Sequence, residues 1–155
     1  MNVELSVTGK PVGQPRVKSR SFIKNGKPIS TVYTPKVADQ WKSLVRLQAR
    51  LKARRRLLEG PLIVTLTFYM PRPKSHYRTG KYSDQLKDNA PTYHDKKPDI
   101  DNLVKAVFDA IGDSKVIWKD DNQVAAMNAL VCYSKEPGAE IKIRELLTDE
   151  IQQSS

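Results

Sequence analysis

The chain has 155 residues, of which 39% are hydrophobic and 28% charged, and its formal net charge at pH 7 is +10. This length suits one domain with its own core but is too short for two, and no apolar run approaches the roughly 20 residues that would cross a membrane. The single cysteine excludes an internal disulfide and fits a reducing cytoplasm, and with only two histidines a zinc site of the usual kind is not expected.

The charge is unevenly distributed along the chain. Residues 10–58 carry fourteen Lys or Arg against one acid, whereas residues 98–155 carry six against eleven. A basic segment of this size fits nucleic acid or an anionic membrane, and the lack of a lipid anchor or apolar patch favours nucleic acid. A basic surface that is merely solvated is the alternative.

The amino-terminal region combines a strand with a basic arm. Residues 3–7 alternate between apolar and polar and predict a first strand. In the arm, residues 9–33, two short segments flank Asn25-Gly26, a pair typical of hairpin turns. An arm of this kind fits a DNA backbone, although a mobile loop without a partner has the same composition. Its candidate nucleic-acid contacts are Arg16, Lys18 and Arg20.

A helix and a strand follow the arm. Thr34-Pro35 predicts a helix start, with a cap and then proline in the first position, and an apolar stripe that includes Trp41 continues toward Leu58. The opposite face of this helix is basic and is either solvated or bound to phosphates. Residues 62–69 alternate with apolar side chains on both faces, which predicts a strand in the centre of a sheet.

Residues 71–97 have no apolar period and mix basic with aromatic side chains. A connection this long is uncommon in a compact domain unless it is functional or disordered. We therefore expect a basic loop that contacts nucleic acid, in which His76 and His94 are polar loop residues without a catalytic role. Its candidate contacts are Arg72, Lys74, Arg78, Lys96 and Lys97.

Residues 97–121 concentrate acids in an otherwise basic protein. Pro98 and the apolar period after Ile100 predict a helix that begins near Pro98, with Asp99 and Asp101 in its first turn, and Gly112 is expected to end it. Lys105 lies one turn after Asp101 on the same face. A short apolar segment then leads to a second acidic pair, which it could bring back beside the first turn. That pair is Asp120 and Asp121.

Three or four carboxylates on neighbouring segments can bind a hard divalent cation, which prefers oxygen ligands. The plainer interpretation is that acids cap the helix and that Asp-Asp-Asn forms an ordinary turn. The two acidic pairs together with Lys105 favour a metal-dependent phosphodiesterase, since a protein that only holds polyanions has little reason to gather acids.

The carboxyl-terminal part completes the sheet. Residues 124–133 predict a strand, Pro137-Gly138 a turn, and residues 141–146 a last strand. Cys132 is expected to be a small, partly buried residue without a chemical role. We assign residues 1–147 to one domain and expect residues 148–155 to be frayed.

The run Lys-Pro-Asp-Ile-Asp-Asn-Leu-Val-Lys-Ala-Val-Phe-Asp-Ala-Ile, followed by Trp-Lys-Asp-Asp-Asn-Gln-Val, resembles the signature of the RusA family of Holliday-junction resolvases, often encoded by prophages. The resemblance is specific over residues 97–124 and looser elsewhere. It implies that Asp99, Asp101 and Asp121 are the essential carboxylates and Asp120 an accessory one. Lys105 would be the catalytic base or a charge stabiliser, and the family implies a homodimer.

The order of elements predicts an α/β (α+β) domain with a small mixed sheet and helices on one face, and the resemblance supports that fold. With it, the residues point to a cytoplasmic endonuclease in which Mg²⁺, or Mn²⁺ in its place, assists hydrolysis in DNA recombination and repair. The expected substrate is a four-way junction. Two alternatives remain: a non-catalytic nucleic-acid-binding protein, and a metal-dependent nuclease for other branched DNA.

Overall fold

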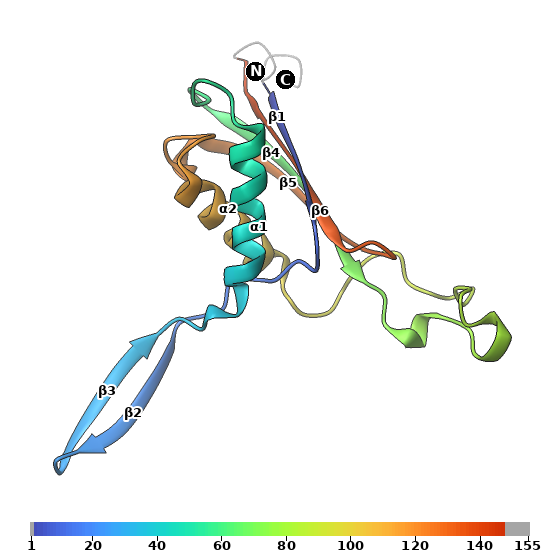
Figure 1. Cartoon of the computed structure of the whole chain (residues 1–155), viewed down its shortest axis with the longest axis horizontal. Helices are drawn as coiled ribbons and strands as arrows, with labels where there is room; N and C mark the ends of the chain where they lie inside the picture. The colour runs from blue at the N-terminus through green and yellow to red at the C-terminus, as the bar shows by residue number, and fades with distance from the viewer. Residues whose placement is uncertain (1, 148–155) are drawn as a thin grey trace, which may run out of the picture.

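The computed structural model describes residues 2–147, which form a small α+β domain with two helices against one face of a mixed sheet (Figure 1). The predicted fold class is confirmed. The sheet has four strands in the order β1-β6-β4-β5, namely Asn2–Thr8, Gly138–Glu145, Leu62–Pro71 and Val124–Ser134. β4 pairs parallel to β5 and antiparallel to β6, and β1 is antiparallel to β6. The predicted tail, residues 148–155, lies outside the described residues.

The strands form where the sequence alternates, because one face of the sheet is covered and the other is open. In β1 only Val3, Leu5 and Val7 are buried, and in β4 every second residue from Leu62 to Met70 is buried. β4 has neighbours on both sides, as its predicted central position requires. Its other face is only partly buried, so the apolar residues there do not indicate a second covering layer.

The first helix, α1, spans Asp39–Lys52 after a short 3-10 turn, Lys36–Ala38. The predicted start at Thr34-Pro35 is confirmed to within one residue, since Pro35 caps the 3-10 turn, but the expected continuation toward Leu58 was wrong. Ala53 is already extended, and the Leu58 amide donates to the Ile117 carbonyl at 2.8 Å, a bond outside any helix. Trp41 is 2% exposed and anchors α1 in the core as predicted.

The second helix, α2, spans Ile100–Ser114 and buries an apolar face against α1 and the sheet. Gly112 does not end it. The helix continues to Ser114 and ends at Lys115, which adopts a left-handed conformation with φ 53°. The cost of an interior glycine, about 1 kcal/mol, is offset by burial of the apolar Ile111 side chain next to it.

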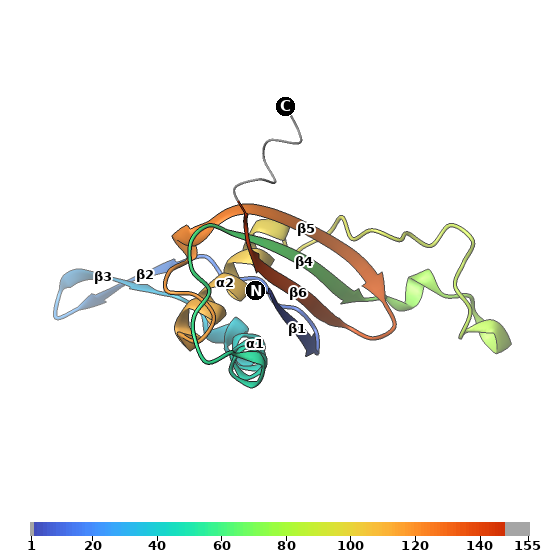
Figure 2. The same cartoon turned by 90° about the horizontal axis from the view of Figure 1, so that it is seen from above.

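Two segments leave the domain on opposite sides (Figures 1 and 2). The basic arm forms a two-stranded hairpin of β2, Lys18–Lys24, and β3, Lys27–Tyr33. The basic loop, residues 71–97, carries two 3-10 turns, Lys74–His76 and Gly80–Tyr82, and then returns to the start of α2. No helix among residues 2–147 is long and apolar enough to span a membrane.

Candidate active site

The acidic helix start is held by backbone contacts that leave its carboxylates free. Asp99 occupies the N-cap position of α2, but its side chain accepts no capping hydrogen bond. The segment before the hairpin packs against this turn, since the Gln14 amide donates to the Asn102 carbonyl at 2.8 Å. A Cβ on Gly13 would lie 3.1 Å from both Pro98 and Asn102, so this approach leaves little room for a larger residue.

These contacts frame a hollow of about 560 Å³ between the arm and the helix. The hollow is lined by Arg16, Lys97 and Asp99, so two of the predicted basic contacts share it with an acid of the α2 N-terminus. Gln14 lines it as well, and its side-chain Oε1 is buried without a hydrogen-bond partner among the described residues. An unsatisfied buried oxygen of this kind is suited to a cation, a water molecule or another donor.

The second acidic pair is fixed by a different set of contacts. Trp118 is fully buried and packs edge-on against Phe108 of α2 at 5.4 Å between ring centroids. The Gln123 side chain accepts from the Asp120 amide at 3.2 Å and donates to the Leu58 carbonyl at 3.1 Å. Gln123, which we did not predict from the sequence, therefore ties the acidic turn to the core, and the Asp-x-x-Gln capping pattern could have identified it.

Asp120 and Asp121 have different surroundings. The Asp120 carboxylate accepts a hydrogen bond from the Asn122 amide at 2.9 Å, which caps the short helix Asp121–Gln123. Asp121 is exposed, and within residues 2–147 no hydrogen bond or ion pair engages its carboxylate, nor that of Asp99 or Asp101. The plainer interpretation, in which the acids only cap and turn, therefore accounts for Asp120 alone.

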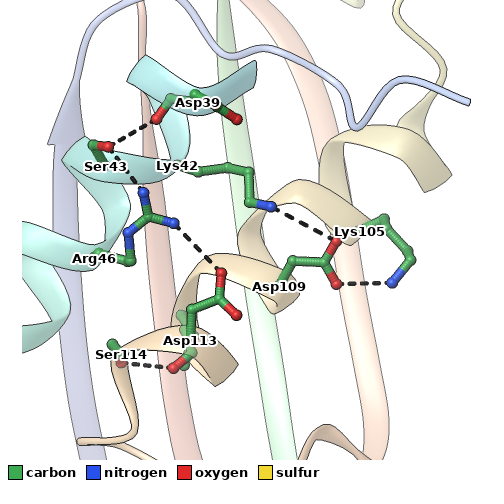
Figure 3. Close-up of polar contacts among 9 residues, drawn as sticks. Asp39, Lys42, Ser43, Arg46, Lys105, Asp109, Asp113 and Ser114 are labelled. Atoms are coloured by element: carbon green, nitrogen blue, oxygen red, sulfur yellow. Dashed lines mark hydrogen bonds and ion pairs between the residues drawn. The ribbon is translucent and has the colours of Figure 1, made fainter. Parts of the chain in front are cut away.

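Lys105 reaches Asp109 rather than Asp101. Its Nζ lies 2.7 Å from one oxygen of Asp109, and Lys42 of α1 approaches the other oxygen at 4.0 Å (Figure 3). The hydrogen bond to Asp109 is the largest cause of a raised pKa at Lys105, and the negative charge of Asp121 adds to it. Lys105 is thus a protonated, exposed cation in the field of Asp121.

The donor chemistry of these residues fits a hard divalent cation, because free carboxylates and an unpartnered amide oxygen are the ligands that Mg²⁺ prefers. In the part of the chain that the structure describes, however, no three His, Cys, Asp or Glu residues are arranged to hold a metal ion. Asp121 borders a second hollow, with Phe108, whereas Asp99 borders the hollow beside Arg16. Like charges without a counter-ion repel, which disfavours a closed cluster.

The basic residues predicted to contact nucleic acid fall into three groups. Lys18 and Arg20 are exposed on the hairpin, and Arg16 and Lys97 line the hollow beside Asp99. The loop residues are mostly engaged locally: Arg72 donates to the Pro91 carbonyl at 2.7 Å, Arg78 pairs with Asp88 at 3.1 Å, and Lys96 pairs with Asp95 at 3.6 Å. Lys74 is exposed in its 3-10 turn.

The base of the loop is fastened to β5 by an aromatic cluster. The rings of His76 and His94 both contact Tyr133 edge-on, at 4.7 and 5.1 Å between centroids, and the Arg72 guanidinium lies 5.4 Å from the same ring. Backbone bonds from His94 to Val131 and from Tyr133 to Thr92 complete the attachment. These contacts give both histidines a structural role.

Comparisons with known proteins agree with this arrangement. The family model described as endodeoxyribonuclease RusA matches residues 8–144, which include both acidic pairs, the hairpin and the loop. A protein of Bacillus subtilis strain 168, named uncharacterized protein YqaN, is 34% identical over 146 residues, covering 93% of this chain and 96% of that protein.

Proposed function

Since the chain belongs to the RusA family of endodeoxyribonucleases, we propose that it resolves four-way DNA junctions by paired, symmetric nicks that depend on Mg²⁺ or Mn²⁺. The observation that carries the proposal is the set of unpaired carboxylates, Asp99 at an N-cap it does not use, Asp101 and Asp121, together with the protonated Lys105, on which the charge of Asp121 acts. A binding protein gains nothing from free acids next to its basic arm.

Asp99, Asp101 and Asp121 would hold the metal, which supplies Lewis-acid activation of the phosphate and of a water nucleophile. The N-terminus of α2 favours negative charge and so also favours a phosphate placed against it. Lys97 and Arg16 line the hollow beside Asp99 and are placed to bind a phosphate there.

We assign Lys105 to charge stabilisation rather than to proton abstraction. A lysine that donates a 2.7 Å hydrogen bond to a carboxylate is held in its protonated form and cannot accept a proton. A fixed cation beside the scissile phosphate stabilises the charge that develops on it. Asp109 acts on this cation as a positioning residue, and Lys42 steadies Asp109 from α1 (Figure 3).

Paired nicks on a two-fold symmetric substrate require two active sites, so we propose that the working form is a homodimer. We also propose that it acts in DNA recombination and repair, in the cytoplasm, as a resolvase of the phage or prophage type. The rival proposal is a metal-dependent nuclease for flaps or forks, which shares the chemistry and differs only in the substrate's shape.

Cleavage of four substrates of equal strand length, a four-way junction, a fork, a flap and a linear duplex, tests the proposal. We expect Mg²⁺-dependent nicks at symmetric positions in the junction, none in EDTA, and cleavage of the other three substrates at least tenfold slower. Faster cleavage of the fork or flap would favour the rival nuclease. Tight binding of DNA without cleavage under Mg²⁺ or Mn²⁺ would show a binding protein.

A further inference from the structure

The hairpin has two chemically different faces. The turn between its strands is Asn25-Gly26, and both residues have positive φ, 51° and 70°, as a two-residue type I′ turn requires. This turn fixes the register, in which Lys24 lies opposite Lys27 and Phe22 opposite Ile29. Residues directly opposite one another in an antiparallel pair point to the same face, so the register assigns each side chain to one side.

One face carries all four cations of the two strands and both of their aromatic rings. It includes Lys18, Arg20, Phe22, Lys24, Lys27 and Tyr33. The sequence from residue 17 to 33 contains no acid that would neutralise these cations. We call this surface the cationic aromatic face.

The other face carries no charge. It is formed by Ser19, Ser21, Ile23, Pro28, Ser30 and Val32. Ser21 and Ser30 approach one another across the strands at 3.5 Å. We call this surface the uncharged face, and it provides a matched control on the same element.

The hairpin stands apart from the domain, and its rings are uncovered. Phe22 is 42% and Tyr33 49% exposed, and among residues 2–147 no helix or third strand packs on either face (Figures 1 and 2). A two-stranded hairpin without such packing is marginally stable in water, so a partner that covers it stabilises it. Four cations without an acid identify an anionic partner by charge complementarity.

The base of the hairpin lies against the acidic helix. The Gln14 amide bonds to the Asn102 carbonyl, and Arg16 shares a hollow with Asp99. DNA bound along the hairpin therefore leads directly to the proposed catalytic acids. From Lys18 to Lys24 the cations extend over six residue steps of β2, roughly 20 Å at about 3.3 Å per step.

We propose that the cationic aromatic face binds DNA at the branch point of a junction, with its lysines and arginine on phosphates and with Phe22 and Tyr33 stacked on unpaired base faces. This inference rests on the proposed function and specifies how the substrate is recognised. Aromatic rings stack on any unpaired base, because every base has a π-face, whereas bases inside an intact duplex are already stacked. The rings therefore provide selectivity for branched DNA, and the cations provide affinity.

The test compares two double variants, Phe22→Ala with Tyr33→Ala, and Ile23→Ala with Val32→Ala on the uncharged face. Binding is measured in EDTA to a four-way junction with 2-aminopurine at the branch point and to a linear duplex of the same length. We expect the aromatic variant to lose about tenfold or more in affinity for the junction and little for the duplex. The wild-type rise in 2-aminopurine fluorescence should be lost, and the control variant should bind like the wild type.

A charge variant, Lys24→Gln with Lys27→Gln, should weaken binding to both DNAs and lower the salt slope by about 0.9 for each phosphate that the variant no longer neutralises. Thermal unfolding should be unchanged in all three variants, since these side chains are exposed. Equal losses of affinity for junction and duplex in the aromatic variant would overturn the stacking proposal. So would a loss of junction binding confined to the Ile23 and Val32 variant, which would make the uncharged face the docking surface.

Because these measurements exclude metal, they do not depend on cleavage. A protein that binds the branch point as described but never nicks DNA would contradict the proposed function and leave this inference standing. If the wild type nicks junctions as proposed but the aromatic variant binds the junction as tightly as the wild type does, the proposed function stands and this inference is contradicted.

Discussion

Asp120 and Asp121 are neighbours in the sequence, but only the Asp120 carboxylate makes a hydrogen bond in the described part of the chain. Asp120 caps the turn through its contact with the Asn122 amide, and Gln123 closes the capping box from the other side. We expect Asp120→Ala to lower the free energy of unfolding by about 1 kcal/mol. Asp120→Asn should leave both stability and cleavage unchanged, because the Asn side chain also caps the turn. Thermal unfolding and junction cleavage measure the two effects.

Asp121→Asn is the matched variant at the next position. It should leave stability unchanged and abolish cleavage, because its carboxylate makes no hydrogen bond in the described chain. Full stability with lost cleavage in Asp120→Asn would show that Asp120 is a metal ligand and not only a cap.

The role of Lys105 is tested by removing its charge. Lys105→Met should lower the cleavage rate by about 10²- to 10³-fold, as for loss of a group that stabilises transition-state charge, while stability changes by only about 0.2 to 0.5 kcal/mol for an i,i+4 pair. Lys105→Arg should recover part of the rate.

Lys42→Met is the control, since Lys42 approaches the same Asp109 carboxylate from α1. Equal losses of rate in the Lys42 and Lys105 variants would mean that both lysines only position Asp109. A wild-type cleavage rate that rises with pH toward the lysine pKa, and no longer rises in Lys105→Met, would instead support proton abstraction by Lys105.

At the scale of elements, the loop is attached through His94, whose ring is partly buried. Burial lowers its pKa below the ordinary value of about 6.5, and Lys96 lowers it further while Asp95 raises it. The neutral ring is therefore favoured in the folded state. Its contribution to stability is complete above pH 6.5 and is lost as the pH falls through the lower pKa of the folded state.

We expect the loop attachment to loosen on acidification before the sheet does. Hydrogen-exchange protection of the His94 and Tyr133 amides, which bond to Val131 and Thr92, should fall between pH 7 and pH 5. Amides in the centre of β4 should keep their protection. His94→Phe should remove the difference, and an unchanged pH response in that variant would assign it to His76 or to another group.

The elements that the sequence predicted correctly are those set by local pattern. Alternation located the strands around Leu5 and Leu66, and Asn25-Gly26 located the hairpin. The carboxyl-terminal ends of the helices were not predicted, because tertiary contacts determine them: the Leu58 amide bonds to Ile117, and packing around Ile111 carries α2 past Gly112. Tertiary contacts of this kind override the local preference of the sequence, and the local sequence carries no signal for them.

The same limit applies to the candidate site. The sequence placed Asp99 and Asp101 at a helix start, as the structure does, but it paired Lys105 with Asp101 on spacing alone. Asp109 satisfies the same spacing, and the contact from Lys42 on another helix could not be foreseen. The closure of Asp99, Asp101 and Asp121 around a cation stays a prediction.

At the scale of the whole molecule, the basic and the acidic residues lie on different segments, and the basic segments project from the domain. The cationic hairpin and the loop extend on opposite sides of the domain (Figure 2), whereas the acids belong to the start of α2 and to the turn after Trp118. Composition predicted this polarity, but the strand order that creates it depends on long-range pairing, such as β4 beside both β5 and β6. The arrangement is suited to a branched polyanion that reaches both projections.

The most direct measurement is cleavage of a synthetic four-way junction by the wild type, Asp101→Asn and Asp113→Asn, with junction binding measured in parallel. Asp113 is the control because it lies on the same helix and pairs with Arg46, at 3.4 Å. We expect paired nicks with Mg²⁺ from the wild type and Asp113→Asn, and none from Asp101→Asn, whose binding is kept or tightened by the loss of a negative charge. Cleavage by Asp101→Asn at the wild-type rate would contradict the proposed mechanism.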